Sequence, residues 1–189
     1  GTENCYLKQR NRKVSYPLSN NICILLMDIF ENRRNTNKKM QEKIIMEILV
    51  CIKQVPDDSV EISLDEATGK PALDGVTPVV NAFDTYALEM AKRYIEDNGG
   101  NVTVATIGDD DATAALRTCL AVGAGKAFLI KDASFAGSDT TAKAYILSKA
   151  VAKIEEINGA KFDIVFCGKE ATDFSKGMVG VQLASELGV

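Results

Sequence analysis

No histidine occurs anywhere in the sequence. The chain therefore lacks the usual general base, the Ser-His and Cys-His nucleophile pairs, and the commonest zinc ligand. These absences argue against an ordinary hydrolase or metalloenzyme, and we expect neither a catalytic residue nor a metal site. If the protein takes part in a reaction, we expect a bound cofactor to carry the chemistry.

Cysteine is scarce, and its spacing forms no C-x-x-C pair. The five cysteines are widely scattered, and the last three lie in apolar runs: Cys5, Cys23, Cys51, Cys119 and Cys167. This pattern is typical of buried thiols in a reducing compartment. We therefore expect a cytoplasmic protein, with Cys51 and Cys167 as inert core residues.

Excess positive charge is also missing. The net charge is -4 and the pI is about 5.0, which gives nucleic-acid binding little electrostatic support. The 46% hydrophobic and 25% charged content is ordinary for a globular protein. A length of 189 residues is enough for one domain with its own core.

The composition changes at Met46. Residues 1–45 contain seven asparagines and nine Lys+Arg against four Asp+Glu, a net charge of +5. Residues 46–189 contain four asparagines and 13 Lys+Arg against 22 Asp+Glu, a net charge of -9. The leading segment has no sustained helical or strand period. We expect residues 1–45 to be a non-native or disordered extension, and residues 46–189 to be the domain.

Residues 1–45 could have one of three origins. The basic stretch 8–13 followed by "ICILLM" is too short for a signal peptide, is interrupted by Asp28, and has no small-residue cleavage site. A membrane span needs about 20 apolar residues, so we expect no membrane segment here. The favoured hypothesis is translated DNA upstream of a start codon at Met46, because Asn, Lys and Ile are what AT-rich non-coding DNA yields.

From Met46 onward, strand patterns alternate with helix patterns. Continuous apolar runs predict buried strands over 47–52, 102–108, 127–130 and 162–168. Periodic apolar positions predict helices around 87–95, 112–120, 147–154 and 179–187, with stops or caps at Gly99, Gly123 and Asp139. Residues 60–64 are expected to pair with 71–75 as an edge hairpin. The fold class is α/β, a three-layer doubly wound and mostly parallel sheet.

Ligands of such sheets bind beyond the carboxyl ends of the strands. The segments to consider are therefore 51–57, 81–84, 106–111 and 168–180. The last, "GKEATDFSKGMVG", is neither a dinucleotide fingerprint nor a P-loop. We expect Gly168 to permit close backbone approach, and the N–H groups that open the following helix to attract phosphate oxygens.

The charged residues at the strand ends can also be interpreted without a ligand. Lys53 is either a ligand contact or a charged residue at a strand end, and both remain open. Asp109, Asp110 and Asp111 could suggest a metal, but we expect them to cap a helix.

The four segments together resemble the beta subunit of electron transfer flavoprotein. "CIKQVPD" is similar to that family's opening signature and "NAFD" to its N-P-[FYD]-[DC] turn. "ALRTCLAVGAGKAFLI" is similar to its A-L-A-M-G-A-D segment, and 168–180 to its G-[KR]-Q-A-I-D-x-D-x-x-Q-[TV]-G loop. The resemblance runs from Met46 to Val189. It implies a Rossmann-like domain of the adenine-nucleotide-binding type, truncated at its C-terminus.

The resemblance also implies a cofactor site, formed by Cys51, Asn81, Ala82, Phe83, Asp84, Ile107, Asp139, Thr140, Gly168, Lys169, Glu170, Ala171, Thr172, Asp173, Phe174, Ser175, Lys176, Gly177, Met178 and Val179. The cofactor would be FAD, or alternatively AMP. "AGSDTTA" and Val179 favour FAD, because two-flavin members have a similar helix start and AMP-only members tend to have Thr in place of the valine. Glu170 and Met178 depart from the family pattern, and Lys176 adds a cation that could neutralise a phosphate.

The implied function is that of an electron-carrier subunit, not a stand-alone enzyme. It would pair with an alpha subunit and accept electrons from dehydrogenases such as acyl-CoA dehydrogenase. In the bifurcating branch, NADH would be the donor and ferredoxin or flavodoxin the low-potential acceptor. The alternative is a stand-alone adenine-nucleotide-binding protein of the universal-stress type, whose G-x-x-G-x(9)-G-[ST] motif does not occur here.

Overall fold

The computed structural model describes residues 22–26 and 45–189. Its centre is a five-stranded sheet in the order β1-β7-β2-β5-β6. The strands are β1 (Ile22–Leu26), β2 (Met46–Cys51), β5 (Gly100–Ile107), β6 (Lys126–Ile130) and β7 (Ile164–Gly168). The pairs β7·β2, β2·β5 and β5·β6 are parallel, whereas β1 pairs antiparallel with β7.

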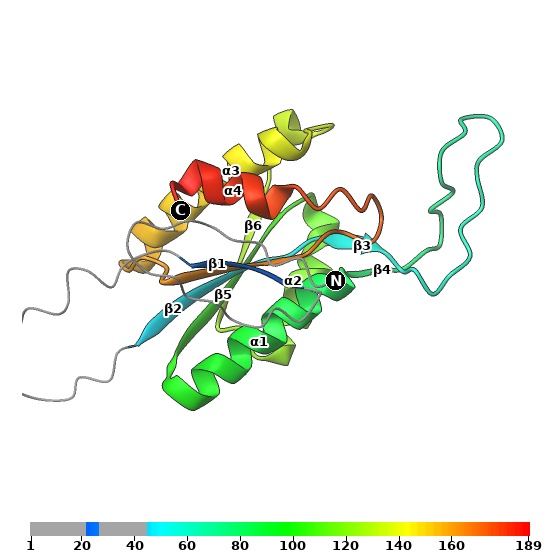
Figure 1. The fold of residues 1–189 in the computed structure, drawn as a ribbon. Coiled ribbons are helices and arrows are strands. Elements are labelled where there is room, and N and C mark those ends of the chain that lie inside the picture. Colours follow the sequence, from blue (N-terminus) through cyan, green and yellow to red (C-terminus); the bar gives the residue numbers. More distant parts are fainter. Residues whose placement is uncertain (1–21, 27–44) are drawn as a thin grey trace, which may run out of the picture.

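Helices cover both faces of this sheet (Figure 1). The short η1 (Asp110–Ala112) leads into α2 (Thr113–Val122), which lies with α1 (Ala82–Asn98) against one face. The short η2 (Ala133–Phe135) precedes α3 (Thr140–Asn158), which packs with α4 (Val179–Leu187) against the other. The three-layer α/β class expected from the sequence is confirmed.

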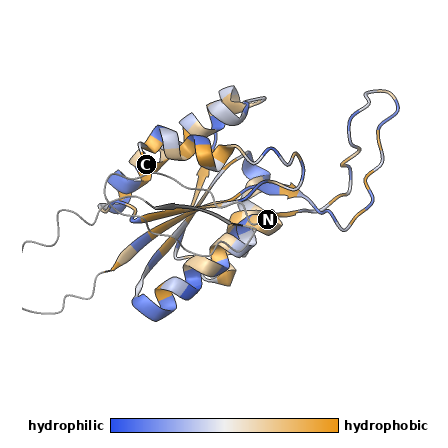
Figure 2. Cartoon of the chain, viewed as in Figure 1, coloured by the Kyte–Doolittle hydropathy of each residue, from blue (hydrophilic) through white to orange (hydrophobic). Residues whose placement is uncertain are grey.

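The strands have apolar residues on both faces because both faces are covered. In β2, Ile48 and Val50 join the core under α1 and α2, whereas Leu49 and Cys51 join the core under α3 and α4. Figure 2 shows apolar residues concentrated on the central strands and on the neighbouring helix faces.

The predicted helix ends are also confirmed. Gly99 ends α1 with φ 80° and donates from its N–H to the Ile95 carbonyl at 2.7 Å. Asp139 caps α3, where its carboxylate accepts from the Ala142 N–H at 2.8 Å. Both devices follow from the residue types, since glycine tolerates positive φ and aspartate pairs with first-turn donors.

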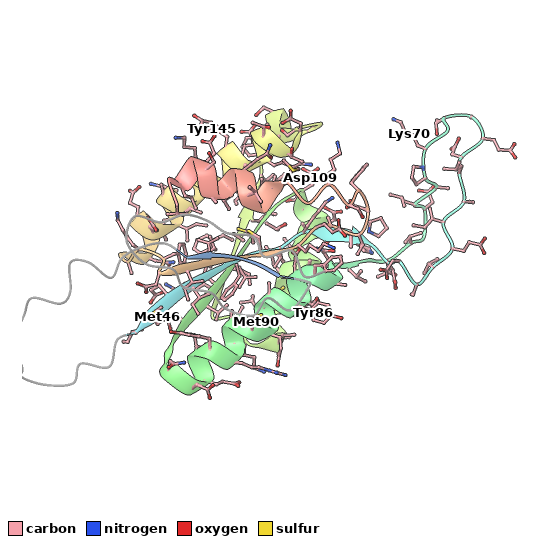
Figure 3. The ribbon with its side chains drawn as sticks, in the orientation of Figure 1. Met46, Lys70, Tyr86, Met90, Asp109 and Tyr145 are labelled. Carbon is pink, nitrogen blue, oxygen red and sulfur yellow. The ribbon has the colours of Figure 1, made fainter. Side chains whose placement is uncertain are left out.

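The expected hairpin between 60–64 and 71–75 forms only in part, at the antiparallel bridge Leu64–Pro71 with its hydrogen bond from the Ala72 N–H to the Ser63 carbonyl at 2.9 Å. Regular pairing occurs at its base, between β3 (Gln54–Pro56) and β4 (Pro78–Val80), and only the bridge Leu64–Pro71 forms farther out. Residues 57–77 instead form an arm that projects from the domain, with Lys70 at its far end (Figures 1 and 3). Most of the arm is exposed, so no packed face stabilises longer strands there.

The leading segment departs from the sequence expectation at one place. Ile22–Leu26 forms β1 and lies along the edge of β7, with Ile22 opposite Gly168 and Leu26 opposite Ile164. The sequence did not predict this strand, because the segment before Met46 has no sustained strand period. Residues 1–21 and 27–44, with Cys5, lie outside the described residues, and the non-native origin of the segment stays a prediction.

Candidate functional site

Four parallel strands end at one side of the sheet, which we call the carboxyl edge. Their last residues are Cys51, Ile107, Ile130 and Gly168. The strand register pairs Cys51 with Cys167 and Ile107 with Ile130, so these ends lie at similar depth. The chain leaves β7 at this edge and reaches α4 through residues 168–179, the 168–179 loop.

The second half of this loop presents unused backbone donors. Within the described part of the chain, no N–H group from Lys176 to Val181 donates a hydrogen bond to protein, and the side chain of Met178, the N-cap of α4, caps no donor. Two residues with positive φ, Ser175 at 47° and Gly177 at 61°, shape the turn into the helix. Successive free N–H groups at a helix start form a site suited to an anion.

Asn81 holds the first half of the loop. Its side-chain amide donates from Nδ2 to the Glu170 carbonyl at 2.8 Å, and its Oδ1 accepts from the Thr172 N–H at 3.2 Å. The residue is 1% exposed, so both polar ends of its side chain are satisfied inside the protein.

Asp84 joins three elements. Its Oδ2 accepts from the Lys53 N–H at 2.7 Å, after β2, and its Oδ1 accepts from the Gly168 N–H at 3.1 Å, at the end of β7. Burial raises the pKa of this carboxyl to about 7, although hydrogen bonds from Asn81, Lys53 and Gly168 oppose the rise.

The structure shows what Gly168 packs against. A Cβ atom there would overlap the Asp84 carboxylate and lie 3.0 Å from both Asp84 N and Phe83 C. The glycine therefore makes room for Asp84, and close approach of a ligand to its backbone stays a prediction.

Lys53 contacts the loop by its side chain. Its Nζ pairs with the Asp173 carboxylate and lies 5.1 Å from the centre of the Phe174 ring. The sequence left open whether Lys53 contacts a ligand or is simply a charged residue at a strand end. The structure shows its side chain bound to the 168–179 loop. The Phe174 side chain is largely exposed.

The remaining predicted site residues are placed as follows. Ala82 and Phe83 open α1, Cys51 is buried at the end of β2, and Ile107 is half-buried at the end of β5. The Asp139 carboxylate is occupied by its cap on α3. Lys169 and Glu170 form a pair at 3.8 Å.

Gln182, which the sequence did not single out, brings two of these segments together. Its Nε2 donates to Thr141 Oγ1 at 3.0 Å, so the start of α3, with Asp139 and Thr140, lies beside the first turn of α4. The Oε1 atoms of Gln182 and Gln54 are buried without a partner among the described residues. No motif marks Gln182, and only the packing of α3 beside α4 shows it, whereas Gln54 lies within the segment "CIKQVPD".

The aspartates 109–111 do not cap as expected. Asp109 precedes η1 without a side-chain cap and lies near the carboxyl edge (Figure 3). Asp110 pairs with Lys131 at 2.6 Å, and Asp111 accepts from Gln54 Nε2 at 3.0 Å. Within residues 22–26 and 45–189, no group of three candidate metal ligands is found, and no helix of that part is long and apolar enough to cross a membrane.

Known proteins that are similar in sequence indicate the family of this chain. Residues 72–189 match the family described as "Electron transfer flavoprotein domain". The chain belongs to the electron transfer flavoprotein family. Within it, the chain is 45% identical over 144 residues to the electron transfer flavoprotein subunit beta of Thermoanaerobacterium thermosaccharolyticum, covering 76% of this chain and 53% of that protein.

Two further relatives extend the comparison. Protein FixA of Azorhizobium caulinodans is 45% identical over 144 residues, which cover 76% of this chain and 50% of that protein. The caffeyl-CoA reductase-Etf complex subunit CarD of Acetobacterium woodii is 39% identical over 143 residues, 75% of this chain and 52% of that protein. The chain spans about half the length of the curated relatives it matches. The resemblance expected from the four segments is confirmed.

Proposed function

We propose that the chain is the nucleotide-binding part of an electron transfer flavoprotein beta subunit, and that its 168–179 loop binds the phosphates of an adenine nucleotide. The observation that carries this proposal is the run of unpaired N–H groups from Lys176 to Val181 at the carboxyl edge. Phosphate oxygens are strong acceptors, and the positive end of the helix dipole of α4 favours their charge.

The charges around the loop fit this ligand. Lys176 is exposed within the run of free donors and adds a cation there. The nearby carboxylates have partners, since Glu170 lies 3.8 Å from Lys169 and Asp173 pairs with Lys53. The departure from the family pattern at Glu170 therefore leaves the phosphate site usable.

We propose FAD as the nucleotide in preference to AMP. The start of α3 lies beside the start of α4 through the Thr141–Gln182 hydrogen bond, so a ligand longer than AMP can reach Thr140. The Thr140 hydroxyl makes no hydrogen bond to the described residues. When bound, the flavin supplies the one- and two-electron chemistry that the histidine-free chain lacks, and the residues named above bind and orient it.

For the whole protein, we propose pairing with an alpha subunit and electron transfer from a dehydrogenase of the acyl-CoA type. The Acetobacterium woodii relative supports this, because its name places it in a complex with a caffeyl-CoA reductase. With FAD in the beta site, we propose NADH as donor and ferredoxin or flavodoxin as low-potential acceptor. The stand-alone universal-stress alternative is not favoured, since the family match and the relatives point to flavoprotein subunits.

The test is to co-express the full-length beta subunit with its alpha subunit and to count the bound cofactors after acid release. Two FAD per heterodimer supports the proposal in full. One FAD and one AMP would assign the protein to the ordinary carrier branch and overturn the preference for FAD. A heterodimer with no nucleotide in the beta subunit would overturn the nucleotide-binding role itself.

A further inference from the structure

We propose that Asn81 and Asp84 are positioning residues for the 168–179 loop. They set the backbone of its first half and act on the nucleotide through that backbone, without touching the ligand. This inference rests on the proposed nucleotide-binding function and reassigns two side chains that the sequence placed among direct cofactor contacts.

Asn81 is itself held rigidly. Its backbone N–H donates to the Lys53 carbonyl at 2.9 Å, and its carbonyl accepts from the N–H groups of Asp84 and Thr85 at 3.0 Å each. The residue is thus fixed between the end of β2 and the start of α1. From this position its amide reaches residues 89 and 91 positions later in the chain, Glu170 and Thr172.

Asp84 fixes the point from which the loop departs. Its carboxylate bridges the N–H groups of Lys53 and Gly168 and is 5% exposed. The Gly168 backbone is packed so closely against Asp84 that no Cβ fits between them. The exit direction of the chain from β7 is therefore determined by the first turn of α1.

The loop has few other attachments. In the described part of the chain, the hydrogen bonds that join residues 169–173 to other elements come from Asn81 and from Lys53, which pairs with Asp173. The Phe174 and Ser175 N–H groups then close a turn on the Ala171 carbonyl at 3.3 and 2.8 Å.

The free donors begin directly after this turn, at Lys176. If the first half of the loop is released, those donors lose their common orientation and must be ordered again on binding. Ordering backbone at the moment of binding lowers affinity, because that entropy cost is subtracted from the interaction energy. The two buried side chains therefore control the affinity of a site that they do not line.

The experiment compares Asn81→Ala with wild type and with Asn98→Ala. Asn98 is a matched control at the other end of α1, where its Nδ2 donates to the Tyr94 carbonyl. Two quantities are measured on the folded full chain: hydrogen exchange of the bonded amides of Phe174 and Ser175 without nucleotide, and AMP affinity by calorimetry. A second variant, Asn81→Asp, keeps an acceptor for the Thr172 N–H but removes the donor to Glu170.

We expect Asn81→Ala to accelerate exchange of the Phe174 and Ser175 amides at least tenfold, with β2 and β5 unchanged, and to weaken AMP binding at least tenfold. Asn81→Asp should show the same pattern to a smaller extent and serves alone if the alanine variant does not fold. Asn98→Ala should change neither quantity.

Equal acceleration in the loop and in the central strands would show a role in general stability only and would overturn the inference. So would unchanged exchange in the loop, or faster exchange with unchanged AMP affinity. If wild type binds neither AMP nor FAD, the proposed function fails, and the claim that Asn81 acts on nucleotide affinity fails with it. The exchange data still show in that case whether Asn81 holds the loop.

Discussion

Replacing Gly168 by alanine should destabilise the protein strongly, because the added methyl group has no space. Its Cβ would overlap the Asp84 carboxylate and lie 3.0 Å from two backbone atoms, Asp84 N and Phe83 C. Backbone atoms cannot give way as the end of a flexible side chain can. The φ of Gly168 is not positive, so any loss of stability comes from packing and not from backbone strain.

The magnitude follows from two contributions. Overpacking of a well-packed region costs about 1–3 kcal/mol. Displacing the carboxylate also weakens its hydrogen bonds with the N–H groups of Lys53 and Gly168, each worth about 1.5–3 kcal/mol when the acceptor is charged. Partial relief by movement of α1 reduces this sum, and we expect a loss of about 3 kcal/mol in the free energy of unfolding.

Urea unfolding at pH 7.5 measures this loss as a lower midpoint at unchanged slope. Gly125→Ala is the matched control, because its Cβ would lie 3.6 Å from the Val102 carbonyl oxygen, an ordinary contact. The control should lose less than about 1 kcal/mol. A loss below about 0.5 kcal/mol for Gly168→Ala would refute the packing account, as would full additivity with Asp84→Ala in the double variant.

Four other outcomes are expected. Burial raises the pKa of Asp84 to about 7 in the folded state. Protonation of Asp84 therefore contributes to the free energy of unfolding below about pH 4, and this contribution, on the order of 4 kcal/mol, is lost as the pH rises through 7. Unfolding curves at pH 5 and 8 should differ less in Asp84→Asn than in wild type. Lys53→Met should weaken AMP binding severalfold at low salt while costing less than about 1 kcal/mol of stability, since its pair with Asp173 is partly exposed; calorimetry at two salt concentrations checks this. Asp139→Ala should cost about 1 kcal/mol through its lost cap on α3, measured by urea unfolding. A chain starting at Met46 should unfold within about 2 °C of the full chain if residues 1–45 are foreign to the domain, and a larger drop in a thermal scan would show that β1 contributes.

Most of the sheet could be predicted because local pattern and burial agree there. β2 and β7 are continuous apolar runs, and such runs are buried on both faces only in a covered parallel sheet. The hairpin in the arm forms only at the Leu64–Pro71 bridge for the converse reason, since the alternating residues 60–64 have no second surface to pack on. β1 could not be predicted, because five residues in a segment without a period became a strand only by pairing with β7.

The position of the site could be predicted from topology, but the roles of its residues could not. Strand order alone places the 168–179 loop at the carboxyl edge. The reason for a glycine at 168 depends on Asp84, and the position of the loop depends on Asn81; each lies more than eighty residues away in sequence. Pairings of that separation leave no local signal.

The most direct test of the central claim is a titration of the ¹⁵N-labelled chain with AMP, followed by NMR. The account predicts saturable shifts concentrated on the amides of Lys176 to Val181, where the free donors lie. The opposite edge of the sheet supplies an internal control, since Asn101 and Gly159 line a hollow of about 530 Å³ there. Shifts confined to that hollow, or no saturable shift at any amide, would contradict the assignment of the 168–179 loop as the nucleotide site.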